Sequence, residues 1–330
     1  MPLIVGAGIG GLTAALALAA RGVPATVVER SPALATEGFG IQLPPNATEV
    51  LHGLGLRDAL AAVSLRPVAR EIRRWSDGAL LGRFPLPPAH LCLRRADLLR
   101  VLHSAAGTVH FGSPWTGSRA DLVIGADGLR SSVRRLLADD SLCPSGFVAH
   151  RAVRPSTVDG PPVVTVRPST VDGPPVVTVW LGPGAHVVAY PVPGGTNVVA
   201  VTGPGAGFGG WHAPVLRLLR GPTAAFALYT RPALPAWHRA GAVVIGDAAH
   251  PMLPFLAQGA AQAIEDAGAL PGFLTDLAGF EALRRPRAEA VAAESAAGGH
   301  EYHLPDGAHQ RRRDDEIAAC GPPGQNWQAT

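Results

Sequence analysis

The stretch Leu3-Ile4-Val5-Gly6-Ala7-Gly8-Ile9-Gly10-Gly11 decides the fold, because it places a Gly-x-Gly-x-x-Gly motif directly after a short apolar strand. Residues 12–20 read as an alanine- and leucine-rich helix, and residues 25–28 as a second strand that ends at Glu29. Gly6 permits the tight turn, Gly8 lets a pyrophosphate approach the backbone, and Gly11 lets helix and strand pack closely. The order predicts a β-α-β dinucleotide-binding unit, with the Glu29 carboxylate placed for a ribose diol.

The same apolar N-terminus has a rival interpretation as a secretory signal peptide. It lacks a basic region at its start, and its glycines interrupt the apolar core. We therefore favour the dinucleotide-binding unit.

The composition bounds the class of protein. The chain has 330 residues, 47% of them hydrophobic and 16% charged, which predicts a sizeable core in one large or two moderate domains. It contains no apolar run of about 18 residues, so no transmembrane segment is predicted. A net charge of +3 is too small to indicate a nucleic-acid partner. The sequence has no lysine, which excludes Schiff-base chemistry.

The three cysteines, Cys92, Cys143 and Cys320, are widely spaced and odd in number. They predict neither a disulfide framework nor a metal site, and they fit a reducing cytoplasm.

The remaining pattern predicts two kinds of sheet. Strands before residue 130 fit a parallel nucleotide-binding sheet, and those between 176 and 202 fit an antiparallel sheet in a second domain. The expected segments are a loop over 38–46, helices over 47–54, 93–102, 259–270 and 280–297, a hairpin over 70–84, and strands over 121–124, 176–181, 186–192, 197–202 and 242–245.

Residues 154–166 and 167–179 are identical in sequence. Two copies are too few for a solenoid, and their prolines prevent either copy from forming one continuous central strand. We interpret the duplication as an added surface loop or hairpin without a function of its own.

Two apolar strands end in an aspartate. Asp127 follows residues 123–126, and Asp247 follows residues 244–246. Ligands of α/β sheets bind beyond the carboxyl ends of the strands, where both carboxylates would lie. Each aspartate could instead cap the next helix. After Asp247, Pro251 and Pro254 delay the helix until Gln258-Gly259-Ala260, and the N-terminus of that helix suits a negatively charged ring such as a reduced flavin.

Together these motifs resemble the single-component FAD-dependent aromatic hydroxylases. The resemblance is carried by Gly6–Gly11 with Glu29-Arg30, by Gly125-Ala126-Asp127-Gly128, and by Gly246-Asp247-Ala248-Ala249-His250-Pro251 running to Gly259. Residues 251–260 and the tail Tyr302-His303-Leu304-Pro305-Asp306-Gly307 are most similar to the salicylate hydroxylase and 3-hydroxybenzoate 6-hydroxylase branch.

The resemblance implies a fold and a cofactor site. The fold would be α/β, a Rossmann-like FAD-binding domain (1–64, 93–146 and 236–300) with an inserted antiparallel-sheet substrate domain (65–92 and 147–235) and a C-terminal tail (301–330). The residues implied to hold FAD are Gly6, Gly8, Ile9, Gly10, Gly11, Glu29, Arg30, Arg95, Asp127, Asp247, Pro254, Gly259 and Ala260. Asp127 would also serve NAD(P)H, for which the chain has no second Gly-x-Gly-x-x-Gly motif.

The implied activity is hydroxylation of a salicylate- or hydroxybenzoate-like phenol with NAD(P)H and O₂, through a flavin C4a-hydroperoxide. On one strand His186 and Tyr190 share a face, with α-carbons about 13 Å apart. By the resemblance, both line the substrate site with Gln258. We expect His186 to assist phenol deprotonation with a near-neutral pKa, and Tyr190 and Gln258 to orient the ring.

The sequence also departs from the family. Several strands are expected between Phe111 and Arg119, where only seven residues stand, and residues 203–225 are short. An inactive FAD-binding paralogue is therefore an alternative. A flavin oxidase or halogenase is a further alternative, and the halogenase ranks low because the chain has no lysine to carry a halogenating intermediate. An ordinary nicotinamide dehydrogenase is another alternative, against which Asp127 and Asp247 argue. The sequence leaves the oligomeric state open, with a homodimer as one alternative.

Overall fold

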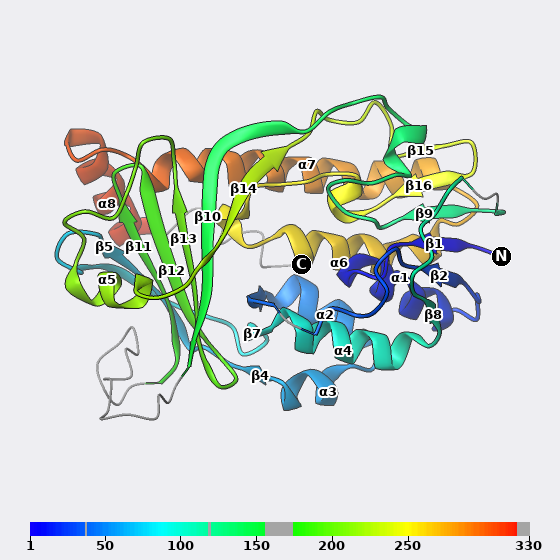
Figure 1. Cartoon of the computed structure of the whole chain (residues 1–330), viewed down its shortest axis with the longest axis horizontal. Helices are drawn as coiled ribbons and strands as arrows, with labels where there is room; N and C mark the ends of the chain where they lie inside the picture. Colours follow the sequence, from blue (N-terminus) through cyan, green and yellow to red (C-terminus); the bar gives the residue numbers. More distant parts are fainter. Residues whose placement is uncertain (37, 118–119, 156–173, 322–330) are drawn as a thin grey trace.

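The computed structural model describes residues 1–36, 38–117, 120–155 and 174–321. Two large sheets lie at opposite ends of the molecule, and the long helix α7 (Leu277–Tyr302) runs past both of them (Figure 1). A small third sheet lies between them, and the remaining helices pack around the sheets. Among the described residues, no helix combines the length and the apolar character needed to cross a membrane.

The N-terminal motif forms the centre of a six-stranded sheet with the order β15-β16-β9-β1-β2-β8. The strands are β1 (Leu3–Val5), β2 (Thr26–Val28), β8 (Val109–His110), β9 (Val123–Gly125), β15 (His238–Arg239) and β16 (Ala242–Val244). All pair in parallel except β15 with β16. The carboxyl ends of β1, β9 and β16 therefore meet at one edge, which confirms the predicted parallel sheet.

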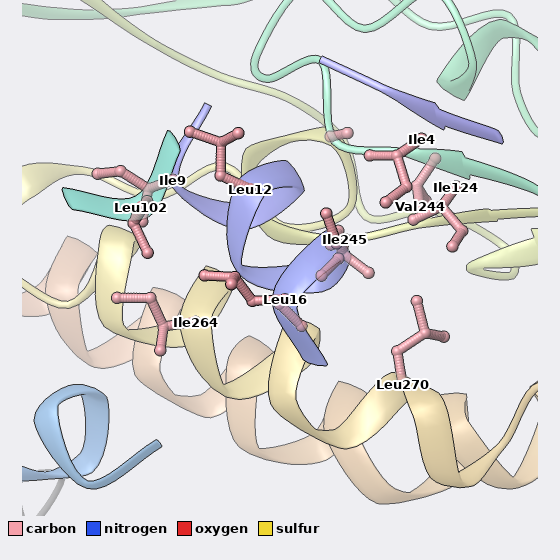
Figure 2. Packing of buried hydrophobic residues seen from close by; sticks show 14 of the residues in the cluster. Ile4, Ile9, Leu12, Leu16, Leu102, Ile124, Val244, Ile245, Ile264 and Leu270 are labelled. Carbon is pink, nitrogen blue, oxygen red and sulfur yellow. The ribbon is translucent and has the colours of Figure 1, made fainter. Parts of the chain in front are cut away.

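Helices cover this sheet and enclose the larger core. In addition to α7 they are α1 (Ile9–Ala19), α2 (Pro45–Gly53), α3 (Arg57–Ala62), α4 (Arg95–Ala106) and α6 (Gly259–Ala269). Helix α1 is buried over most of its length, because its Leu12 and Leu16 pack between the sheet and Ile264 of α6 (Figure 2). The alanine-rich sequence of α1 permits this close approach on several sides.

The second large sheet has seven strands in the order β14-β10-β13-β12-β11-β5-β6. They are β5 (Ala69–Arg74), β6 (Leu80–Pro85), β10 (Cys143–Pro155), β11 (Val176–Gly182), β12 (Ala185–Val192), β13 (Gly195–Thr202) and β14 (Ala224–Thr230). The predicted hairpin β5–β6 and the predicted antiparallel strands β11–β13 are confirmed. One pair departs from the antiparallel pattern, since β5 joins β11 in parallel. The division of the chain into domains stays a prediction.

A three-stranded sheet, β3-β7-β4, corrects two expectations. Its strands are β3 (Gly40–Leu43), β7 (Leu91–Arg94) and β4 (Ser64–Leu65). Residues 40–43 were expected in a loop but pair with β7, because a distant segment supplies the hydrogen-bonding partner. The helix expected over 93–102 begins at Arg95 for the same reason, since β7 takes Leu93 and Arg94.

Shorter elements complete the chain. Helix α5 (Ala213–Leu219) covers the outer face of the seven-stranded sheet, and α8 (Ala308–Cys320) packs against β6, so the expected C-terminal tail contains an ordered helix. The 3₁₀ turns are η1 (Arg134–Leu136), η2 (Gly246–Ala248), η3 (Pro254–Leu256) and η4 (Leu270–Gly272).

The sequence duplication lies between two paired strands of the second sheet. Arg154 and Pro155 of the first copy end β10, and Val176–Val179 of the second copy begin β11. The surface loop or hairpin predicted for the duplication falls mainly on residues 156–173, which lie outside the described residues.

Candidate active site

The turn between β1 and α1 needs glycine at two positions, because a side chain there would clash with the backbone. A third glycine of the motif borders open space. Gly6 has a φ of +103°, and a Cβ there would lie 2.6 Å from the Ala126 carbonyl oxygen. A Cβ on Gly11 would lie 1.9 Å from the Gly6 carbonyl oxygen. A Cβ on Gly8 would meet no atom within 4 Å. The open space beside Gly8 is where the backbone can receive a ligand, as the motif predicts.

Glu29 is fixed beside this turn at the end of β2. Its carboxylate accepts hydrogen bonds from the backbone N–H groups of Ala7 at 2.9 Å and Ser31 at 2.8 Å. Burial alone would raise the pKa of Glu29, but these hydrogen bonds and the Arg30 charge bring it below its usual value. Glu29 is therefore ionised and positioned to accept a further hydrogen bond, while Arg30 is exposed.

A cavity of about 560 Å³ connects the six-stranded sheet to the seven-stranded sheet. Its first end is lined by residues of the glycine turn and of the loops after β9 and β16, and its second end by β10–β13. The predicted site residues in its wall are Gly8, Ile9, Gly10, Arg95, His186, Tyr190, Asp247, Pro254, Gly259 and Ala260. Gly6, Gly11, Glu29, Arg30 and Asp127 lie outside this wall.

Asp247 and Arg95 face the first end of the cavity with unused hydrogen-bonding capacity. Neither side chain has a hydrogen-bond partner among the described residues. Asp247 lies deep in the molecule, yet its side chain is exposed to the cavity. Burial raises the pKa of Asp247, although His250 and Arg95 oppose the shift, and burial with the nearby Arg151 charge lowers the pKa of Arg95. Both groups are therefore suited to contacting a bound polar ligand.

The carboxylate of Asp127 is hydrogen-bonded within its own loop. Its carboxylate accepts hydrogen bonds from the Ser131 hydroxyl at 2.5 Å, and from the Ser132 backbone N–H at 2.6 Å and hydroxyl at 2.7 Å. These contacts support the alternative that Asp127 organises the turn before η1. The neighbours Ala126 and Gly128, rather than Asp127, line the cavity. A direct role for Asp127 toward NAD(P)H stays a prediction.

Arg134 is a buried cation that sequence reasoning missed. Its guanidinium pairs with Asp140 at 2.6 Å and donates to the carbonyl oxygens of Ala248 at 3.0 Å and Ala249 at 2.9 Å. It thereby fixes the backbone immediately after Asp247. The signal in the sequence is an arginine seven residues after Asp127, but nothing local shows that it reaches the loop after β16.

The structure corrects the expectation for Gln258. Its side chain is buried at 1% exposure, outside the cavity wall, where its Oε1 accepts hydrogen bonds from Asn46 at 3.2 Å and Gln262 at 3.3 Å. The residue before it, Ala257, has a φ of +55°, and this left-handed conformation turns the chain so that Ala257 and Gly259 line the cavity. Gln258 therefore supports the loop behind the site and does not face a bound ring.

Gln258 belongs to a buried polar network beneath the loop after β16. Arg284 of α7 is bonded to Asp266 at 2.8 Å, to Glu265 at 2.6 Å and to Gln262 at 2.8 Å. Asp266 in turn accepts hydrogen bonds from the Gly246 backbone N–H at 2.9 Å and the His250 ring at 2.6 Å. The network ties α6 and α7 to the residues flanking Asp247.

His186 and Tyr190 lie where the strand pattern places them. Both project from β12 into the second end of the cavity, together with Val188. The alternate residues Val187 and Ala189 pack on the opposite face in the cluster that includes α5. The shared face predicted from the period of two is therefore present.

The near-neutral pKa expected for His186 is wrong. The side chain is only 3% exposed, and burial, with the adjacent His303, lowers its pKa well below 6.5. The ring is surrounded by Phe255, Tyr302 and His303, at centroid distances of 5.4, 5.4 and 5.1 Å. His186 is therefore a neutral imidazole at pH 7.

Arginines give the cavity a positive character. Arg70, Arg95 and Arg151 line it, and Asp247 is the one acid among the described wall residues. Arg151 donates to the Gly40 carbonyl oxygen at 2.8 Å and lies 4.9 Å over the Phe39 ring. Arg70 has no hydrogen-bond or ion-pair partner in the described part of the chain. An anionic ligand would complement this wall.

The residues at the first end fit FAD. The open Gly8, the N-termini of α1 and α6, and the unpartnered Arg95 and Asp247 offer the backbone and side-chain donors and acceptors that a flavin dinucleotide requires. Glu29 stands at the end of β2, where such folds bind a ribose.

Comparison with known proteins also indicates a FAD-binding protein. A family model described as FAD binding domain matches residues 2–114. The chain is 40% identical to 3-amino-4-hydroxybenzoate 2-monooxygenase of Streptomyces cremeus over 97% of this chain and 92% of that protein. It is 32% identical to 6-hydroxynicotinate 3-monooxygenase of Bordetella bronchiseptica over 81% of this chain and 80% of that protein. The 377 aligned positions of the first match exceed the 330 residues of this chain, so that relative has segments without a counterpart here.

Solved structures share the fold. Klebsiella pneumoniae HpxO complexed with FAD and uric acid has a TM-score of 0.84 at 22% identity, covering 99% of this chain and 95% of that one. A salicylate hydroxylase substrate complex has a TM-score of 0.79 at 24% identity, covering 99% and 94%. The glycine turn, the cavity and the extent of the sequence matches lead to one conclusion: this chain belongs to the family of FAD-dependent aromatic monooxygenases.

Proposed function

We propose that this protein hydroxylates a phenolic carboxylate, of the hydroxybenzoate or salicylate type, with FAD, NAD(P)H and O₂. The observation that carries the proposal is the continuous cavity, which joins the glycine turn, Arg95 and Asp247 to the sheet face bearing His186 and Tyr190. The relatives named for 3-amino-4-hydroxybenzoate and 6-hydroxynicotinate act on hydroxylated aromatic acids, which supports this substrate class.

Each end of the cavity has its own task. FAD, when bound at the first end and reduced by NAD(P)H, supplies the two-electron chemistry that places one atom of O₂ on an aromatic ring. At the second end, apolar residues such as Val177, Val188 and Val201 exclude water from the ring. Arg70 or Arg151 attracts the carboxylate, and His186 holds or accepts the phenol proton.

The domain division and cell compartment are part of the same proposal. The six-stranded and seven-stranded sheets support a cofactor domain built from 1–64, 93–146 and 236–300 and a substrate domain built from 65–92 and 147–235. Cys92, Cys143 and Cys320 are unpaired, which supports a reducing, cytoplasmic environment. A homodimer stays a prediction.

The proposal is tested on the purified protein. We expect a yellow protein with a flavin spectrum and about one FAD per chain. Salicylate, 3-hydroxybenzoate and 3-amino-4-hydroxybenzoate are then supplied with NADH or NADPH, and the products are analysed by mass spectrometry under ¹⁸O₂. Incorporation of one ¹⁸O atom into any of these acids supports the proposal. A protein that cannot be loaded with FAD, or a loaded protein that hydroxylates none of them, contradicts it.

A further inference from the structure

Two histidines meet at the wall of the cavity. His186 Nδ1 and His303 Nε2 are 2.8 Å apart, so one of the two nitrogens donates a hydrogen bond to the other. His186 lines the cavity from β12, whereas His303 follows the last residue of α7 and is half-buried. The pair therefore links the enclosed site to the outer layer of the protein.

The surroundings of this pair differ from those of His250, another buried histidine. His250 is bonded to the carboxylate of Asp266 at 2.6 Å, which can hold a positive imidazolium in place. Among the described residues neither His186 nor His303 is hydrogen-bonded to an acid. Their neighbours are instead the rings of Phe147, Phe255 and Tyr302. A charge formed here has no fixed counterion in the protein.

The two remaining ring nitrogens have different environments. His303 Nδ1 is buried without a partner. His186 Nε2 has no partner among the described residues, yet it is not among the buried orphaned atoms, so it is open to the cavity. When His186 donates from Nδ1 to His303, its Nε2 presents a lone pair to whatever occupies the cavity.

We infer that His303 is the second member of a proton relay that carries the phenol proton of the substrate away through His186. This inference rests on the function proposed above. The substrate O–H bond breaks as His186 Nε2–H forms, and His186 Nδ1–H breaks as His303 Nε2–H forms. The phenolate keeps the electron pair and one negative charge, His186 stays neutral, and His303 holds the proton as a positively charged imidazolium.

Burial explains why the charge is placed on His303. Desolvation penalises a charged imidazole more strongly in the fully buried ring than in the half-buried one. Burial lowers the pKa of His303 to about 4, and burial together with the adjacent His303 lowers the pKa of His186 well below 6.5. Sharing the proton with His303 therefore avoids a buried imidazolium at His186, which is the obstacle to its acting alone as the base.

The test follows substrate ionisation without turnover. FAD-loaded, oxidised protein is mixed with 3-amino-4-hydroxybenzoate in a stopped-flow instrument, and the ultraviolet phenolate band and the colour of phenol red in weak buffer are recorded. His303→Gln retains a hydrogen-bond acceptor for His186 Nδ1 but cannot take a proton. His300→Gln, an exposed histidine less than one turn earlier in α7, is the matched control.

We expect the wild type and His300→Gln to form phenolate with the proton kept on the protein, so that phenol red does not change colour, while His303→Gln forms phenolate at least about 10-fold more slowly. Added imidazole should restore the rate in His303→Ala. Equal rates in the wild type and His303→Gln would overturn the relay and leave the proposed function standing. A wild type that binds none of the phenolic acids tested would instead contradict the proposed function itself.

A second measurement keeps the inference testable if the variants fail to hold FAD. Wild-type protein labelled with ¹⁵N-histidine is titrated with the same acid, and the imidazole nitrogens are observed by NMR. The relay predicts that phenolate formation is accompanied by one new imidazolium. Phenolate formation without a new imidazolium would exclude it.

Discussion

Arg134 and Asp140 form a buried ion pair, with 2.6 Å between the guanidinium and the carboxylate and no exposure of the arginine side chain. The same guanidinium holds the Ala248 and Ala249 carbonyl groups, so the loop that carries Asp247 depends on a residue more than a hundred positions earlier in the chain. Arg231 also pairs with Asp140, at 2.5 Å, so Asp140 stays paired when Arg134 is removed, and the cost of removal lies in the buried carbonyl groups left without their donor.

Replacing Arg134 should therefore lower both the stability of the fold and the retention of FAD. Arg134→Met is expected to lower the free energy of unfolding by about 1–3 kcal/mol and to weaken FAD retention. The neighbouring Arg135 is exposed, so Arg135→Met should stay within about 0.5 kcal/mol of the wild type. Chemical denaturation and FAD titration measure both effects. Similar stability of the two variants would show that the buried contacts contribute little.

The two strand-end aspartates should respond differently to the same substitution. Asp127 accepts hydrogen bonds from its own loop, and an amide oxygen can replace most of them, so Asp127→Asn should keep FAD and stability. Asp247 faces the cavity without a protein partner, so Asp247→Asn should lower FAD affinity while leaving the apoprotein equally stable or more so. Fluorescence titration with FAD and thermal melts of the apoproteins separate the outcomes, and unchanged FAD affinity in Asp247→Asn would count against a cofactor contact.

If Asp127 also serves the nicotinamide step, Asp127→Asn should slow flavin reduction more than it changes the melting temperature. Stopped-flow reduction by NADH and NADPH measures this rate. Equal rates in the wild type and the variant would limit Asp127 to the turn that it organises.

Deleting residues 167–179 should leave the fold intact. The deletion joins Val163–Val166 to Trp180, which restores the Val-Val-Thr-Val sequence that begins β11. Shortening the connection should lower its closure cost by about 1 kcal/mol, so FAD content and stability should be unchanged or higher. A deletion of equal length over residues 170–182 removes β11 itself and should give insoluble protein. Loss of flavin-loaded protein in the first deletion would mean that the second copy is built into the fold.

His186 should control coupling rather than cofactor binding. His186→Ala should retain FAD and oxidise NAD(P)H but release H₂O₂ in place of hydroxylated acid, because no base accepts the phenol proton. His150 lies on β10, two strands away from β12 and outside the cavity wall, so His150→Ala should behave as the wild type. Product and peroxide yields are compared per NAD(P)H consumed. Full coupling in His186→Ala would remove His186 from the reaction.

Buried neutral histidines should make the protein sensitive to mild acid. Burial lowers the pKa of His90 to about 3, from 6.5 in the unfolded chain. The folded state thus binds fewer protons than the unfolded state below pH 6.5, and stability must fall as the pH decreases. Between pH 6.5 and 5 His90 alone should contribute a slope approaching about 1.4 kcal/mol per pH unit, and His90→Gln should reduce the total slope by that amount. Denaturant melts across this range measure the slope, and an unchanged slope in His90→Gln would contradict the assignment.

Local sequence determined those features that depend on neighbouring residues alone. The strand, glycine turn and helix at the N-terminus follow from backbone sterics at Gly6 and Gly11. The common face of His186 and Tyr190 follows from the two-residue period of a strand, and the delayed start of α6 from two prolines. These signals predicted the β-α-β unit and several residues of the cavity wall, while the family resemblance implied FAD.

Tertiary structure alone decided what depends on distant partners. Residues 40–43 form a strand because β7 lies beside them. Gln258 turns away from the cavity because Asn46 and Gln262 donate hydrogen bonds to its side-chain oxygen. The pKa of His186 falls because segments far apart in the chain bury its ring, and His303 reaches it across 117 positions. The protonation state of His186 and the side-chain direction of Gln258 depend on burial and on contacts with distant residues. Local periodicity and spacing encode neither the burial nor these contacts.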